Sequence, residues 1–210
     1  YELLGWAAAS ANRYIIEDDY DSEFRLTGKP IPSLQSMDIT QKVIYINTFT
    51  KSLSSTMRIS YMVLPPELAN RFLEQLSFYS CTVSNFEQYA LMRFINEGYF
   101  EKHINRMRNF YHKQRDILLD AIKRSPLSSH VTIMEEDSGL HFLLKLKMEL
   151  SDKEFMQRAL QKGVKLNSLS AYYHDSPDDF AAHTFIINYS YLNTEHLAEA
   201  INVLYDCIKK

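Results

Sequence analysis

The stretch Thr48-Phe49-Thr50-Lys51-Ser52-Leu53-Ser54-Ser55-Thr56-Met57-Arg58 decides how this chain is interpreted. It lies between two short apolar runs, residues 43–47 and 59–64, and a third such run at 14–17 precedes it. Apolar runs of about four to eight residues, bounded by polar residues, are typical of strands in α/β sheets. The sequence therefore predicts three strands at these positions, with 14–17 as a buried parallel strand, and an α/β fold.

Reactive polar side chains follow two of these predicted strands. Asp18 and Tyr20 come directly after the first strand, and Lys51 comes after the second. In open α/β sheets, ligands bind beyond the carboxyl ends of the strands. A lysine amine can form a Schiff base with an aldehyde cofactor, an acid can protonate a ring nitrogen, and a phenol can contact a ring hydroxyl. Together with Arg58 as a phosphate ligand, the pattern indicates a pyridoxal phosphate site.

Each of these residues also has a simpler interpretation when it is considered alone. A single lysine in a loop rich in serine and threonine is usually exposed to solvent, and Glu17–Asp21 could be a solvated acidic turn or a weak metal site. The acidic run lacks the loop of about twelve residues and the central glycine of an EF-hand. Cys81 and Cys207 match no metal or redox spacing. We therefore expect no metal.

Residues 15–25 (Ile-Ile-Glu-Asp-Asp-Tyr-Asp-Ser-Glu-Phe-Arg) and 48–68 carry a family resemblance. Together they resemble the aminotransferase-like module of the MocR subgroup of GntR-family bacterial transcription regulators. That module is similar to the fold-type I aminotransferases, which depend on pyridoxal 5'-phosphate (PLP). The resemblance covers the whole chain, more weakly after about residue 110, and the phrase at 17–24 is more typical of the regulators than of the free enzymes.

The resemblance implies a role for each candidate residue. Lys51 would form the internal aldimine, the catalytic or sensing bond to the cofactor. Asp18 would pair with the pyridine nitrogen, and Tyr20 would contact the ring hydroxyl. Arg58 and Thr48 would hold the phosphate. The implied partners are a small amine or amino-acid effector, a second copy of the full-length protein, and DNA through a winged-helix domain upstream of residue 1.

The same resemblance implies a division of the chain into two parts. Residues 1–100 would be the C-terminal part of the large PLP-binding α/β domain, and residues 101–210 would be a linking helix and a small α+β domain. The chain would thus be a partial fold-type I PLP-dependent transferase. Apolar spacing predicts helices and strands that accord with this division. The predicted helices are 1–11, one starting at 65–67, 84–97, 99–123, 151–162 and 194–208, and the later strands are 131–134, 140–146, 164–167 and 184–190.

Two features set limits on enzyme activity. By the resemblance, the half of the large domain before residue 1 supplies a glycine-rich phosphate loop and a ring-stacking aromatic residue. We therefore expect the chain alone to bind PLP weakly or not at all. The arginine with which aminotransferases hold the substrate carboxylate is matched by Ile186, and residues 169–173 contain no arginine either. An apolar side chain cannot replace a bidentate arginine clamp, so ordinary transamination is not expected.

Three functions remain open at this stage. The leading one is the effector-sensing module of a transcription regulator; the alternatives are a genuine class I/II aminotransferase and a protein-interaction module that has lost the cofactor. A formal net charge of −3 gives no overall basic field for nucleic acid. The basic residues between Lys102 and Arg115 are expected to form a solvated helix face. The sequence has neither an apolar run long enough to span a membrane nor a signal peptide, and we expect a cytoplasmic location.

Overall fold

The computed structural model describes residues 1–26, 31–137, 139–174 and 178–209. The chain divides into two compact units. The first comprises Tyr1–Glu23 and Gly28–Arg106, and the second comprises Phe24–Thr27 and Met107–Lys210. Each unit has one sheet and its own helices, which confirms the predicted mixed α/β fold.

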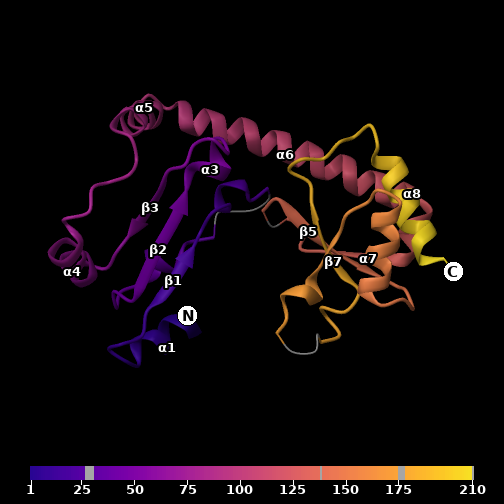
Figure 1. Ribbon diagram of the computed structural model, residues 1–210, viewed down its shortest axis with the longest axis horizontal. Helices are drawn as coiled ribbons and strands as arrows, with labels where there is room; N and C mark the ends of the chain where they lie inside the picture. Colours follow the sequence, from indigo (N-terminus) through magenta and orange to yellow (C-terminus); the bar gives the residue numbers. More distant parts are fainter. Residues whose placement is uncertain (27–30, 138, 175–177, 210) are drawn as a thin grey trace. The chain divides into compact units, whose positions relative to one another are not determined.

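Three strands form the sheet of the first unit, in the order β1 (Ile15–Asp18), β2 (Val43–Thr48) and β3 (Ser60–Val63). Figure 1 shows them side by side. β1 runs parallel to β2, and β3 runs antiparallel to β2. The carboxyl ends of β1 and β2 and the beginning of β3 therefore meet at one edge of the sheet.

Local sequence signals set the helix ends in the first unit. Pro66 stands at the start of α4, where its missing N–H costs nothing, and Ser33 caps α2 through its side chain. Gly98, with a φ of 75°, separates α5 from α6. The helices of this unit are α1 (Glu2–Ala8), α2 (Leu34–Met37), α3 (Phe49–Ser52), α4 (Pro66–Leu76), α5 (Asn85–Asn96) and the first part of α6 (Tyr99–Arg124).

The prediction that the first strand is buried is wrong for this chain. Ile16 on β1 is 67% exposed, and all four residues of β3 are exposed. Within the described ranges, no strand pairs with the outer side of β1 or of β3, since β2 lies between them. Side chains stand on the faces of a sheet, so an apolar strand is buried only where other elements cover those faces.

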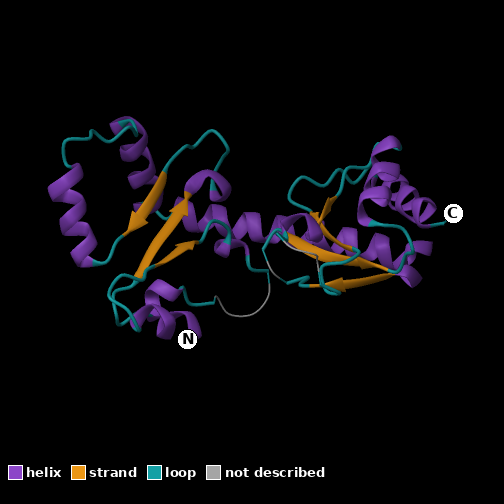
Figure 2. Ribbon diagram, turned by 60° about the horizontal axis from the view of Figure 1, so that its bottom comes forward, coloured by secondary structure: helices purple, strands orange, loops and turns teal. Residues whose placement is uncertain are grey.

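The second unit holds a four-stranded antiparallel sheet in the order β4-β5-β7-β6. The strands are β4 (Val131–Met134), β5 (His141–Leu146), β6 (Asn167–Ser168) and β7 (Thr184–Asn188). Two helices, α7 (Asp152–Gln161) and α8 (Leu197–Ile208), lie side by side beside it (Figure 2). Single 3-10 turns at Ser22–Phe24, Pro126–His130 and Leu169–Tyr172 complete the regular structure.

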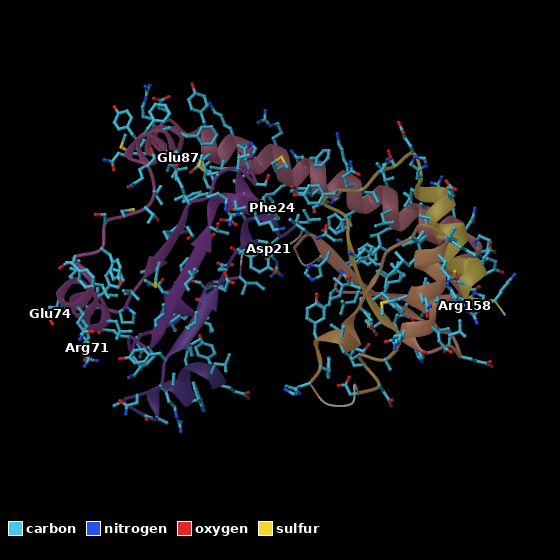
Figure 3. All side chains as sticks on the ribbon, viewed as in Figure 1. Asp21, Phe24, Arg71, Glu74, Glu87 and Arg158 are labelled. Carbon is cyan, nitrogen blue, oxygen red and sulfur yellow. The ribbon has the colours of Figure 1, made fainter. Side chains whose placement is uncertain are left out.

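Aromatic side chains fill the core of the second unit. Residues of β5 alternate between half-buried and buried, as expected for a strand with one face on a core. Phe155 from α7 packs on Phe185 from β7 with ring centroids 5.2 Å apart. Phe24, labelled in Figure 3, is fully buried and meets Tyr111 edge-on at 5.1 Å. The segment around Phe24 thus belongs to this core although it precedes it by about 80 residues in the sequence.

Two further predictions are corrected by the structure. The strand expected at 164–167 is reduced to the two residues of β6, because Gly163 turns with a φ of 86° and Val164 N–H bonds back to the carbonyl of Ala159. Arg115 is not on a solvated face: it is 7% exposed and pairs with Asp137 at 2.8 Å.

The long helix predicted at 99–123 is confirmed as α6. Within the described ranges, no helix has the length and apolar content needed to cross a lipid bilayer.

Candidate functional site

Lys51 lies in the single turn of α3, which begins where β2 ends. Thr48 caps this turn by accepting a hydrogen bond from the backbone N–H of Thr50 at 3.2 Å. The hydroxyl of Thr50 in turn donates to the carbonyl of Met57 at 2.9 Å, and the N–H of Phe49 donates to the carbonyl of Ile59 at 2.9 Å. These bonds fix the loop that carries Lys51 against the residues that lead into β3.

Arg58 belongs to the same edge as Lys51. It stands two residues before β3, and Ser60, the first residue of that strand, pairs with Thr48, the last residue of β2. Asp18 ends β1 and pairs with Ile46 of β2. The structure therefore brings the ends of all three strands, and the candidate residues on them, to one edge of the sheet.

The three consecutive acids at this edge, Glu17, Asp18 and Asp19, make different contacts. Glu17 accepts hydrogen bonds from the backbone N–H groups of Leu34 and Gln35 at 2.7 and 2.9 Å, so its carboxylate stabilises the start of α2. Asp19 accepts a hydrogen bond from the Tyr45 hydroxyl at 2.8 Å. Between them, Asp18 is exposed, and its carboxylate has no hydrogen bond or ion pair with any described residue.

Lys51 and Arg58 resemble Asp18 in this respect. Both side chains are exposed, and neither makes a hydrogen bond or an ion pair within the part of the chain that the structure describes. Tyr20 is 42% exposed two residues beyond Asp18. Asp18, Lys51 and Arg58 thus have no intramolecular partner among the described residues, whereas Glu17 and Asp19 stabilise the fold.

Thr48 differs from the other candidates because its hydroxyl is already engaged. Besides capping α3, it lies 3.0 Å from the Thr50 hydroxyl and 3.2 Å from the carbonyl of Ile59. Its contribution to the loop is therefore structural in this chain, and contact with a phosphate would require one of these bonds to change. The role that the sequence predicts for Thr48 stays a prediction.

A buried polar network beside this edge was not anticipated from the sequence. Asn47 is 3% exposed and donates to the Tyr45 hydroxyl at 3.0 Å and to a carboxylate oxygen of Glu23 at 3.5 Å. Burial, together with the nearby charge of Asp19, raises the pKa of Tyr45 well above its usual value. Burial also raises the pKa of Glu23, aided by the charges of Asp19 and Asp21. The signal in the sequence was a pair of polar residues at alternate positions of an otherwise apolar strand.

The donor set at this edge fits the cofactor that the sequence predicts. PLP needs an amine, a carboxylate and a cation, and Lys51, Asp18 and Arg58 offer these groups without an intramolecular partner among the described residues. The hydroxyl of Ser52, next to Lys51, is buried and has no hydrogen-bond partner in the described part of the chain. The assignment of these residues to a PLP site stays a prediction.

No model of a known protein family matches the chain. Curated proteins do match it, among them two bacterial regulators. The uncharacterized HTH-type transcriptional regulator YdeL of Bacillus subtilis (strain 168) is 47% identical over 176 residues, 84% of this chain and 38% of that protein. The probable rhizopine catabolism regulatory protein MocR of Rhizobium meliloti is 36% identical over 191 residues, 91% of this chain and 38% of that protein.

Solved aminotransferases share the fold. The kynurenine aminotransferase of Pyrococcus horikoshii, whose crystal structure contains PMP, is 29% identical and superposes with a TM-score of 0.81 over 99% of this chain and 50% of that chain. The fold is therefore that of the fold-type I aminotransferases, as predicted. The chain spans about half of that enzyme and less than half of the regulators that it matches.

Proposed function

Because this chain is a partial, aminotransferase-like module homologous to the MocR-type transcription regulators of the GntR family, we propose that it is the effector-sensing module of such a regulator. The proposal rests on one observation above the others. The strand ends that carry Asp18, Lys51 and Arg58 lie at one edge of the sheet, and none of these side chains has a partner among the described residues. Charged groups that stabilise a fold are usually paired, as Glu17 and Asp19 are.

The roles that we assign follow from the chemistry of each side chain. When bound, PLP supplies an aldehyde that exchanges between amines. Lys51 supplies the amine that anchors the cofactor, and an amine effector competes with it. The carboxylate of Asp18 holds a proton on the ring nitrogen, and the Tyr20 hydroxyl donates to the ring oxygen. Arg58 binds the phosphate through its planar fork of N–H donors.

The wider function concerns the full-length protein. The two regulators are longer than this chain, which supports a further segment in the full-length form of this protein. We propose that this segment contains a winged-helix domain that binds DNA in the cytoplasm, and that the protein acts as a homodimer. Displacement of Lys51 by a small amine or amino acid then changes the balance of conformations that the DNA-binding domain reads out.

A genuine aminotransferase is the second candidate, favoured by the likeness to the Pyrococcus enzyme over almost the whole chain. Ile186 argues against an aminotransferase activity. It lies on β7, where it pairs with Leu143 and Asn167, and it offers no donor for a substrate carboxylate. Repeated turnover of a keto acid by the full-length protein would favour the enzyme over the sensor.

The proposal is tested by incubating the full-length protein with PLP, reducing with borohydride and mapping the labelled peptides by mass. We expect one adduct, on the peptide that contains Lys51. Lys51→Ala should abolish it, whereas Lys102→Ala, a control at an exposed lysine of the same unit, should leave it unchanged. Addition of an effector amine before reduction should lower the label. Scattered labelling of surface lysines, or none, would contradict the proposal and favour an interaction module.

A further inference from the structure

Asp19 and Tyr45 connect the ends of the two parallel strands at the candidate site. The backbone N–H of Asp19 donates to the carbonyl of Ile46 at 2.9 Å, and its carboxylate accepts from the Tyr45 hydroxyl at 2.8 Å. The segment that carries Asp18 and Tyr20 is therefore attached to β2 at two points, one on the backbone and one on a side chain.

The register of the strands separates this contact from the cofactor groups. Glu17 pairs with Tyr45, and Asp18 pairs with Ile46. Because successive residues of a strand point to opposite faces, Asp18 lies on the face opposite to Tyr45 and Asp19. The Asp19–Tyr45 contact therefore fixes the segment on one face of the sheet, and the Asp18 carboxylate lies on the other face, where this contact does not occupy it.

The contact is itself supported by buried groups. Asn47, 3% exposed, donates to the Tyr45 hydroxyl and fixes its position, while its side-chain carbonyl accepts from the N–H of Thr48 at 2.5 Å. The same amide thus touches both the Asp19–Tyr45 pair and the residue that caps the Lys51 turn. A tyrosine hydroxyl keeps its proton at neutral pH, so Tyr45 can donate to Asp19 there.

We propose that Asp19 and Tyr45 are positioning residues for the cofactor, coupled through Asn47 to the turn that carries Lys51. This inference deepens the proposed function and rests on it. The pair sets where the Asp18 carboxylate stands relative to Lys51, and so how strongly the ring nitrogen of the cofactor is held in its protonated form. Neither residue touches the cofactor.

A spectroscopic experiment separates this role from a purely structural one. The full-length protein is prepared as Tyr45→Phe, which removes one hydroxyl, and as Asp19→Asn, which removes one charge. Glu17→Gln is the matched control, because Glu17 lies on the same strand and stabilises α2 instead. PLP binding is measured by the absorbance of the Lys51 adduct, its pH titration is recorded, and the melting temperature is measured for each variant.

We expect Tyr45→Phe to weaken PLP binding about tenfold, the effect of losing one hydrogen bond to a charged group. Asp19→Asn, which keeps an oxygen acceptor but no charge, should weaken it less. Both should also move the pH at which the adduct absorbance titrates. The double variant should resemble Tyr45→Phe, because Tyr45→Phe already removes the contact that Asp19→Asn weakens. Glu17→Gln should lower the melting temperature and leave the titration unchanged.

Each result has a defined meaning. If wild type forms the Lys51 adduct, and Tyr45→Phe and Asp19→Asn titrate as Glu17→Gln does, the positioning role is overturned and the proposed function stands. If wild type forms no adduct at Lys51, the proposed function fails and this inference fails with it. A titration shift in Tyr45→Phe and Asp19→Asn alone would support the inference.

Discussion

The two units of this chain differ in how many of their apolar side chains are buried and in how many of their charged side chains are hydrogen-bonded. Most of the fully buried apolar residues belong to the second unit, where aromatic rings from the strands and from α7 pack on one another. In the first unit, the buried apolar side chains among the described residues are few: Ala7, Val43, Ile59, Leu91 and Ile104. The first unit instead exposes apolar side chains on both outer strands of its sheet, β1 and β3.

Two aspartates show the same contrast among polar groups. Asp152, at the start of α7, accepts hydrogen bonds from the hydroxyls of Ser168 and Ser170, both at 2.7 Å, and from the backbone of His183 at 3.0 Å. Asp18 has no such donor in the described part of the chain. In the described residues, Asp152 of the second unit thus has several hydrogen-bond donors, whereas Asp18 of the first unit has none.

The largest expected effect comes from opening the core of the second unit. Phe185→Ala removes a fully buried ring that packs on Phe155, so the free energy of unfolding should fall by about 3–5 kcal/mol. Urea denaturation followed by circular dichroism measures it. The fluorescence of Trp6, the single tryptophan, reports on the first unit.

Ile16→Ala is the matched variant in the first unit. Because Ile16 is 67% exposed, the change should alter the free energy of unfolding by less than about 0.5 kcal/mol. Equal losses for the two variants would break the comparison, since they would mean that β1 is buried in solution. A loss in Phe185→Ala that appears equally in the Trp6 signal would show that the units unfold together.

An intermediate effect is expected at Asp152. Burial alone would raise the pKa of this carboxyl, but hydrogen bonds from Ser170, Ser168 and His183 outweigh it and lower the pKa below 3.8. A carboxyl with a lowered folded-state pKa contributes stability above its unfolded pKa and loses it as the pH falls through the folded pKa. Asp152→Asn should therefore cost about 1.5–3 kcal/mol at neutral pH and less in acid.

Asp120→Asn is the control for Asp152→Asn. Asp120 forms an exposed ion pair with Arg124 on α6 at 3.0 Å, a contact that contributes little. Thermal melts of both variants between neutral pH and pH 3 would measure the difference. A cost in Asp152→Asn that does not shrink below pH 4 would show that the carboxylate charge is not what the serine hydroxyls stabilise.

The arrangement of strands and helices was largely predictable because it depends on local patterns. Apolar runs and helical spacing located the first three strands and α6 to within one or two residues. The extent of β6 was missed because Gly163 turns the chain back on α7, and a backbone bond to Ala159 does not show in a pattern of apolar residues. The exposure of Ile16 was missed because burial depends on which elements cover a strand.

The candidate site was predictable only in part. Lys51, Asp18, Tyr20 and Arg58 were selected by residue type and spacing, and the strand pairings bring their positions to one edge. The Asp19–Tyr45 contact could not be found in this way, because it joins residues 26 positions apart. Such a contact follows from strand register, which the sequence alone does not fix. The different contacts of the adjacent acids Glu17, Asp18 and Asp19 also follow from strand register and could not be predicted for the same reason.

The smallest expected effect concerns Glu23, whose pKa is shifted in the opposite direction to that of Asp152. Burial raises the pKa of Glu23 above 4.5, and the charges of Asp19 and Asp21 add to this, against hydrogen bonds that include one from Asn47. A group whose folded-state pKa is raised contributes stability below its unfolded pKa and loses it as the pH rises through the folded pKa.

Glu23→Gln should therefore match wild type near pH 4 and become more stable than wild type as the pH rises toward 7. The amide keeps an oxygen that can accept from Asn47, and it carries no charge at any pH, so it mimics the protonated acid. Thermal melts followed by Trp6 fluorescence measure the difference, with Glu74→Gln on the exposed face of α4 as control. Parallel pH curves for Glu23→Gln and wild type would mean that water reaches the Glu23 carboxylate. The polar network around Asn47 would then be more open than the structure indicates, and the contrast with the Asp152 cluster of the second unit would be larger.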